Sequence, residues 1–185
     1  VGRRGRAVDA LLARLDDDAA AVGHGVAGVD DQVDQDLLDL SRIESGRWRP
    51  EVAAIDVAET ASEVWADVAD RAAEAGVAFS TEIGVGAATL LADPEGVRLV
   101  LRNLLDNAVR YTPRGGRITL RSAVAEGGIA LQVEDTGSGI PQEHLSRVFE
   151  RFYRVDPSRS RAEGGTGLGL AIVRHTVEAH GGRVG

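Results

Sequence analysis

The chain has 185 residues, enough for one globular domain of roughly 100–150 residues and an appended segment. It contains no cysteine, which excludes a disulfide framework, a thiolate nucleophile and a cysteine zinc site, and agrees with a reducing cytoplasm. The net charge of −8 argues against nucleic acid as a partner, because phosphate backbones attract clustered positive charge. No apolar run approaches the roughly 18 residues of a membrane span. We expect a cytoplasmic chain with no span of its own, either free or held at a membrane by a partner or an upstream region.

The negative charge is concentrated near the N-terminus, where residues 9–44 carry ten acidic residues and two arginines. Apolar residues recur there in steps of three and four, which predicts an amphipathic helix. They are Leu12, Leu15, Ala19, Val22, Val26, Val29, Val33, Leu37 and Leu40. Three glycines, each costing about 1 kcal/mol relative to alanine, disfavour this helix in isolation. It therefore needs a surface to pack on, either its own domain or, as we favour, a helical bundle with another chain.

A break follows this acidic helix, because Gly46 suits a helix C-cap and Pro50 cannot continue a helix. We place an acidic helical segment at 1–46, a linker at 47–55 and a globular domain at 56–185. In that domain the pattern predicts helices at 56–75, 94–112, 142–149 and 168–179, and extended segments at 77–83, 88–92, 117–124 and 129–134. This order predicts an α/β (α+β) sandwich whose mixed sheet is covered by helices on one face.

The segment NLLDNAVRYTP carries two amides and a cation on one predicted helix face. Asn103 and Asn107 are four residues apart, and Arg110 follows three residues later. Such a group can bind a metal ion and phosphates together. A short pattern of this kind, however, is often only the solvated polar face of a helix.

The segment VEDTGSGIP places Asp135 at the end of a predicted strand, before Gly137 and Gly139. A carboxylate there can accept a hydrogen bond from the exocyclic amine of adenine, and the glycines let the backbone approach a flat ligand. A plain Asp-Gly turn is the alternative interpretation.

The segment GGTGLGLAI exposes consecutive backbone N–H groups at the start of a predicted helix, which makes an anion cradle. It lacks the Lys-Ser/Thr of a Walker loop, and no strand directly precedes it as in a dinucleotide fingerprint. A glycine-rich hinge is the alternative.

Between the glycine segments lies VFERFYRVDPSRSRAEGG, in which Phe149 and Phe152 are candidates to anchor a loop that carries four arginines. Those arginines are Arg151, Arg154, Arg159 and Arg161. Arginines on a closing loop can bind triphosphate oxygens, whereas a solvated basic loop is the alternative.

Taken together and in this order, the four motifs resemble the catalytic domain of sensor histidine kinases, within the ATPase superfamily that also includes gyrase, Hsp90 and MutL. NLLDNAVRYTP resembles the N box, DTGSGI the first glycine box, VFERFYR the F box and GTGLGL the second glycine box. DLLDLSRIESGR, residues 36–47, resembles the close of the family's dimerisation helix hairpin.

The resemblance implies ATP and Mg²⁺ as cofactors and phosphoryl transfer to a histidine nitrogen. It implies catalytic roles for Asn103 and Arg154, with Arg154 stabilising the γ-phosphate, and a metal site at Asn107 with Asn103 beside it. Asp135 is expected to bind the adenine amine, and Arg110 is expected to contact phosphate. Tyr111 is expected to lie on the ribose or adenine side of the nucleotide. The full nucleotide-binding set implied is Asn107, Arg110, Tyr111, Asp135, Gly137, Gly139, Ile140, Phe152, Thr166, Gly167, Leu168, Gly169 and Leu170.

One position separates kinase from hydrolase within the superfamily. Gyrase-like members place a glutamate four residues before the metal-binding asparagine to activate water, and here that position is Asn103. An amide cannot accept a proton at neutral pH, so transfer to an acceptor is favoured over hydrolysis. A non-catalytic ATP-binding scaffold and a protein-serine kinase of the anti-sigma type remain as alternatives.

No segment resembles the family's acceptor sequence His-Glu-Leu-Arg-Thr-Pro, and His24 lacks the neighbours of such an acceptor. We therefore expect the acceptor on a partner, a histidine-containing dimerisation or phosphotransfer protein or domain, or on a part of the same protein outside this sequence. A response regulator is expected downstream.

Overall fold

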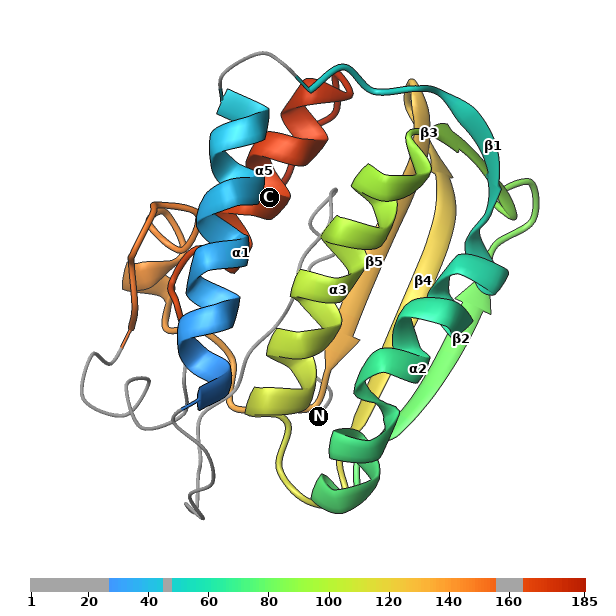
Figure 1. Ribbon diagram of the computed structural model, residues 1–185. Helices are drawn as coiled ribbons and strands as arrows, with labels where there is room; N and C mark the ends of the chain where they lie inside the picture. Colours follow the sequence, from blue (N-terminus) through green and yellow to red (C-terminus); the bar gives the residue numbers. More distant parts are fainter. Residues whose placement is uncertain (1–26, 45–47, 156–164) are drawn as a thin grey trace.

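The computed structural model describes residues 27–44, 48–155 and 165–185 (Figure 1). The elements are α1 Ala27–Glu44, β1 Ala53–Asp56, α2 Val57–Ala75, β2 Ala78–Ile83, β3 Thr89–Ala92, α3 Pro94–Tyr111, β4 Arg117–Ala125, β5 Gly128–Asp135, the 3₁₀ helix η1 Gln142–His144 and α5 Gly169–Ala179. The first part of the predicted acidic helix, with His24, lies outside the described residues, as do Arg159 and Arg161.

Helices α2 and α3 each begin after an aspartate that caps the first turn. The N–H of Glu59 donates to Asp56 Oδ1 at 2.9 Å, and the N–H of Gly96 donates to Asp93 Oδ1 at 2.7 Å. Each bond satisfies a backbone donor that the first helical turn leaves without a partner. Helix α2 ends at Gly76, whose φ of 68° is the left-handed conformation that glycine adopts without strain.

The sheet is mixed, as the sequence predicts. In the order β2-β4-β5, β2 pairs with β4 in parallel and β4 pairs with β5 antiparallel. Helices α2 and α3 lie over one face of this sheet, and α5 packs beside α3 (Figure 1). The predicted α+β architecture with helices on one face is therefore confirmed.

The uncovered face of the sheet is polar because strand residues alternate between the two faces. On β4, Ile118 and Leu120 are fully buried toward the helices. The alternate residue Thr119 has its Oγ1 3.2 Å from Ser80 Oγ, and Arg121 donates to Glu82 at 2.6 Å. These polar pairs need no further layer to cover them.

The core centres on α3, whose Leu101, Leu104 and Leu105 are fully buried between the sheet and α5. Each buried leucine contributes roughly 1.5–3 kcal/mol relative to exposure. This rigid helix also carries the NLLDNAVRYTP motif, so the core fixes the orientation of that motif. No helix in the described ranges is long and apolar enough to cross a membrane.

Two segments differ from the sequence expectations. Residues 53–56, which span the end of the predicted linker and the first residue of the predicted domain, form β1, which pairs antiparallel with β3 in a separate two-stranded sheet. The helix predicted at 142–149 is only the 3₁₀ helix η1, followed by turns. Leu145, the apolar residue that would anchor a longer helix, is 45% exposed, so no buried stripe supports one.

Helix α1 packs against α5 within the same chain (Figure 1). Leu40 is buried in a small cluster with Leu168 and Ile172. Leu37, placed by the sequence on the same seam, is 41% exposed, and Leu38 is 55% exposed. The acidic helix thus covers its own domain with one face and keeps leucines on another face open.

Candidate functional site

The start of α5 meets the second half of α3, which brings two of the sequence motifs together. A β-carbon placed on Gly169 would stand 2.8 Å from Asn103 Oδ1 and 3.7 Å from Asn107 Nδ2. Asn103 is oriented by its Nδ2, which donates to the backbone oxygen of Leu99 at 2.8 Å. The predicted pair of amides and the predicted anion cradle are therefore neighbours in the fold.

Arg110 lies on the same stretch of α3 as the asparagines. Its Nη2 is 3.2 Å from Asp106 Oδ2, and its side chain is 20% exposed. Asp106 also forms an ion pair with Arg71 of α2. The carboxylate holds Arg110 near the predicted site, and Tyr111, the last residue of α3, is partly buried beside it in the chain.

Asp135 ends β5 and is buried, as expected for a residue that reads a base. Its Oδ1 accepts a hydrogen bond from the N–H of Gly137 at 2.8 Å, which fixes the carboxylate to the turn that follows. Gly139 has a φ of 75°, so this turn needs a residue without a β-carbon. Ile140 follows in partly buried backbone.

The F-box segment contacts the second glycine loop through the backbone. The N–H of Phe152 donates to the oxygen of Gly167 at 2.9 Å, and a β-carbon on Gly167 would stand 3.0 Å from Phe152 Cα. Phe152 itself has a φ of 60°, and its side chain is 63% exposed. Phe152 thus holds the loop by its main chain, whereas the expected anchoring by its ring is not seen.

Neighbouring residues of this segment form a side-chain cluster. His144 Nδ1 is 2.5 Å from the Tyr153 hydroxyl, and the Arg147 guanidinium lies 4.2 Å from the centre of the Tyr153 ring. Arg154 is partly buried and Arg151 exposed. The hydrogen bond between Glu150 and Arg147 raises the pKa of Arg147, so this cation stays charged across the ordinary pH range.

Helix α1 supplies a residue to the glycine loop that the sequence does not indicate. Thr166 Oγ1 donates to Asp36 Oδ2 at 2.7 Å, and the same Oγ1 accepts from the N–H of Leu168 at 3.1 Å. Asp36 is one acid among many on the acidic helix, so nothing in the local pattern distinguishes it. The Leu168 amide, predicted to bind phosphate, has an internal acceptor here, and Leu170 follows in the first turn of α5.

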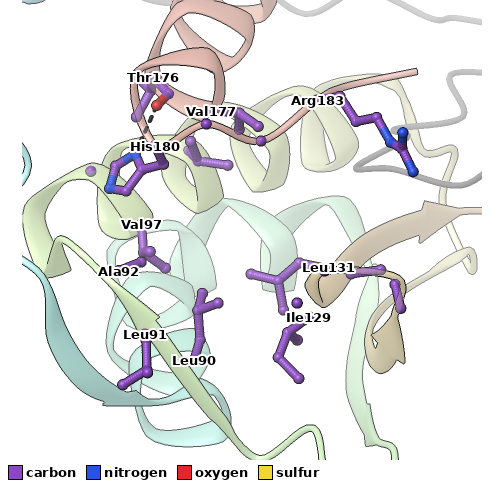
Figure 2. A pocket seen from close by; sticks show the side chains of 18 of the residues that line it. Leu90, Leu91, Ala92, Val97, Ile129, Leu131, Thr176, Val177, His180 and Arg183 are labelled. Atoms are coloured by element: carbon purple, nitrogen blue, oxygen red, sulfur yellow. Dashed lines mark hydrogen bonds between the residues drawn. The ribbon is translucent and has the colours of Figure 1, made fainter.

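A cavity of about 920 Å³ lies elsewhere, between the start of α3, the end of α5 and the edge strand β5 (Figure 2). Figure 2 shows Val97, Leu131, Val177 and His180 around it. None of the predicted site residues lines it. The cavity is therefore separate from the site formed by α3 and the glycine loops.

The donor set at the α3 site agrees with a nucleotide and its metal ion. Amide oxygens are hard ligands of the kind that Mg²⁺ accepts, and the loop before α5 carries backbone N–H groups of the kind that bind phosphate. The buried Asp135 beside two glycines agrees with an adenine amine. These groups come from three separate motifs, and the fold brings the asparagines of α3 and the loop before α5 into direct contact.

Known proteins resemble this chain in sequence and in fold. A family model described as histidine kinase-, DNA gyrase B-, and HSP90-like ATPase matches residues 92–185. The chain is 40% identical over 151 residues to the sensor protein IrlS of Burkholderia pseudomallei, covering 82% of this chain and 32% of that protein. It is 35% identical over 193 residues to the sensor-like histidine kinase SenX3 of Mycolicibacterium smegmatis, covering 100% of this chain and 49% of that protein.

Among solved structures, full-length ShkA in complex with AMPPNP matches with a TM-score of 0.71 and 28% identity, over 84% of this chain and 32% of that chain. The chain spans less than half the length of each of these three relatives. The matched family segment covers half of the chain and includes α3, strands β4 and β5, and both glycine loops. The chain therefore belongs to the histidine kinase-, DNA gyrase B-, and HSP90-like ATPases and carries the ATP-binding domain of that family.

Proposed function

We propose that this ATP-binding domain is the catalytic part of a protein histidine kinase, which transfers the γ-phosphoryl group of ATP to a histidine on a partner chain or on another part of the same protein. The observation that carries the proposal is the packing of Gly169 against Asn103 and Asn107, which supports a site where the loop before α5 binds phosphate and the amides bind the metal ion. In the reaction the bond from the γ-phosphorus to the bridging oxygen breaks, and ADP keeps its electron pair. A bond from phosphorus to an imidazole nitrogen forms.

The absence of a carboxylate at position 103 supports transfer over hydrolysis. Asn103 has no basic atom, and its Nδ2 is already bonded to the Leu99 oxygen. A water near the γ-phosphate would find no proton acceptor in this side chain. The site is therefore suited to hold ATP until an imidazole nucleophile arrives.

We assign Mg²⁺ to Asn107, with Asn103 beside it, because Asn103 Oδ1 faces Gly169 at the start of α5 and the Asn107 amide lies beside the same residue. The ion neutralises phosphate charge when bound. Arg110, held by Asp106, is then placed to meet a phosphate oxygen, and Arg154 is assigned to the γ-phosphate. Asp135 is assigned to the adenine amine.

The partner is assigned to the open face of α1. Leu37 and Leu38 are exposed, on a helix that resembles the second helix of a dimerisation hairpin. An exposed leucine pair on an amphipathic helix favours packing with other helices. A histidine-containing dimerisation domain is the expected occupant, and a response regulator is the expected recipient of the phosphoryl group.

Transfer of label from γ-labelled ATP tests the proposal. The protein is incubated with Mg²⁺, alone and with a histidine-containing dimerisation protein from the same source, and ATP binding is measured in parallel. Asn107→Asp is expected to abolish transfer, because a carboxylate changes the charge and geometry at the metal. Gln132→Glu makes the same chemical change on the polar face of the sheet and is expected to leave transfer intact.

The stability of the label distinguishes the alternatives. Acid-labile label on the partner, lost with Asn107→Asp, supports a histidine kinase acting on another chain. Acid-stable label on the partner points to a serine kinase, and ATP binding without transfer to any histidine partner points to a scaffold. Acid-labile label on this chain alone would place the acceptor within it, at a histidine such as His24.

A further inference from the structure

The buried carboxylate of Asp36 lies against the loop that precedes α5. It is 5% exposed and accepts a hydrogen bond from Thr166 Oγ1 at 2.7 Å. Asp36 belongs to α1, whereas the matched family segment begins only at residue 92. An acidic side chain from outside that segment therefore reaches into the phosphate loop.

The bond from Thr166 to Asp36 affects the backbone N–H of Leu168, which is expected to bind phosphate. A hydroxyl has one hydrogen to donate, and Thr166 gives it to Asp36, so the oxygen lone pairs face the Leu168 amide, which donates to them at 3.1 Å. An acceptor that is itself hydrogen-bonded to a carboxylate is a stronger acceptor. The Leu168 N–H must leave this partner before it can bind a phosphate oxygen.

The negative charge of Asp36 also opposes the binding of phosphate at this loop. The N-terminus of α5 attracts negative charge, and the Asp36 carboxylate already supplies a negative charge close to it. A triphosphate that approaches this end of α5 is repelled by that carboxylate. The apolar contacts of Leu40 with Leu168 and Ile172 hold the helix that carries the charge in place.

We infer that Asp36 is an internal anion that competes with the phosphates of ATP for the glycine loop, so that docking of α1 on α5 and binding of ATP oppose each other. This inference rests on the proposed ATP site. Because linkage is reciprocal, a docked α1 weakens ATP binding and bound ATP weakens the docking of α1. A partner that pulls α1 away through its open leucine face thereby raises the affinity for ATP.

Equilibrium binding of ATP and of adenosine to the whole chain tests the inference. Asp36→Asn keeps the shape and an accepting oxygen but removes the charge, and it is expected to tighten ATP binding at least about fivefold, the lower end of ordinary coupling between sites. Leu40→Ala loosens docking without touching the charge and is expected to change ATP affinity in the same direction. Adenosine has no phosphate, so its affinity is expected to change little in the Asp36 variant.

Gln35→Ala, on an exposed position of the same helix, is the matched control and is expected to leave both affinities unchanged. The reciprocal readout is hydrogen exchange in α1, which ATP is expected to accelerate and adenosine is not. An ATP affinity that is unchanged or weaker in Asp36→Asn would overturn the inference while leaving the proposed function intact. If neither the wild-type protein nor this variant binds ATP, both the inference and the proposed function fail.

Discussion

The Oδ1 atom of Asn103 lies 2.8 Å from the point where a β-carbon would stand on Gly169. The asparagine cannot turn away freely, because its Nδ2 holds the Leu99 oxygen at 2.8 Å. Position 169 therefore has to be glycine if the amide is to keep its place at the start of α5. The contact joins the asparagine-bearing part of α3 to the first residue of α5.

Gly169→Ala is expected to displace the Asn103 amide and to weaken ATP binding by about tenfold, or roughly 1.4 kcal/mol. Stability is expected to change by less than about 1 kcal/mol, because alanine favours the helix while the contact opposes it. Titration calorimetry and urea unfolding measure the two effects. Gly128→Ala is the control, since a β-carbon there meets nothing within 4 Å. Equal ATP affinities for the two variants would contradict the contact between α3 and α5.

Asp93 is expected to matter more for stability than an ordinary helix cap. Its Oδ1 accepts from Gly96, its Oδ2 accepts from the N–H of Glu51 at 2.8 Å, and its own N–H donates to His180 Nε2 at 3.1 Å. Asp93→Ala removes the cap and also leaves the Glu51 N–H without its acceptor. We expect a loss of about 2–3 kcal/mol in the free energy of unfolding.

Asp56→Ala provides the matched comparison for Asp93, because Asp56 caps α2 through a single exposed bond to Glu59. Its loss is expected to cost about 1 kcal/mol. Urea unfolding of both variants gives the difference. If the Asp93 variant loses no more stability than the Asp56 variant, the bond to Glu51 contributes nothing.

These two caps also show which parts of the fold the sequence predicts. Asp56 and Asp93 act on N–H groups three residues away, so local pattern suffices for α2 and α3. Strand β1 is not predictable in this way, because only Ile55 of its four residues is buried and no alternation is visible. Pairing with β3, more than thirty residues away, forms that strand.

The site is predictable in its residues but not in all of its contacts. The sequence motifs single out Asn103, Asn107 and Gly169, although the residues alone cannot show that the helices carrying them meet. The bond from Thr166 to Asp36 joins residues 130 apart and involves one acid among ten in its segment. A contact of that kind depends on tertiary packing, which no spacing rule predicts.

The stability of the domain is expected to fall in mild acid through His175. Burial, followed by repulsion from Arg174 and Arg151, lowers the pKa of His175 below its ordinary value of 6.5. Below pH 6.5 the unfolded chain therefore binds a proton that the folded protein does not, and stability decreases until the pH reaches the folded pKa. Above pH 6.5 the residue is neutral in both states and contributes no pH dependence.

His175→Gln removes this titration, so the drop in melting temperature between about pH 7.5 and about pH 5.5 is expected to be smaller in the variant than in the wild type. Arg174→Ala keeps the imidazole and removes only one cation. Because burial is the larger cause of the lowered pKa, this variant is expected to raise the pKa of His175 only part of the way back to its ordinary value. NMR titration of the imidazole protons measures the pKa of His175 directly. A His175 that titrates at or above 6.5, or equal acid sensitivity in the wild type and His175→Gln, would contradict the assignment, because the folded protein would then hold the proton as readily as the unfolded chain.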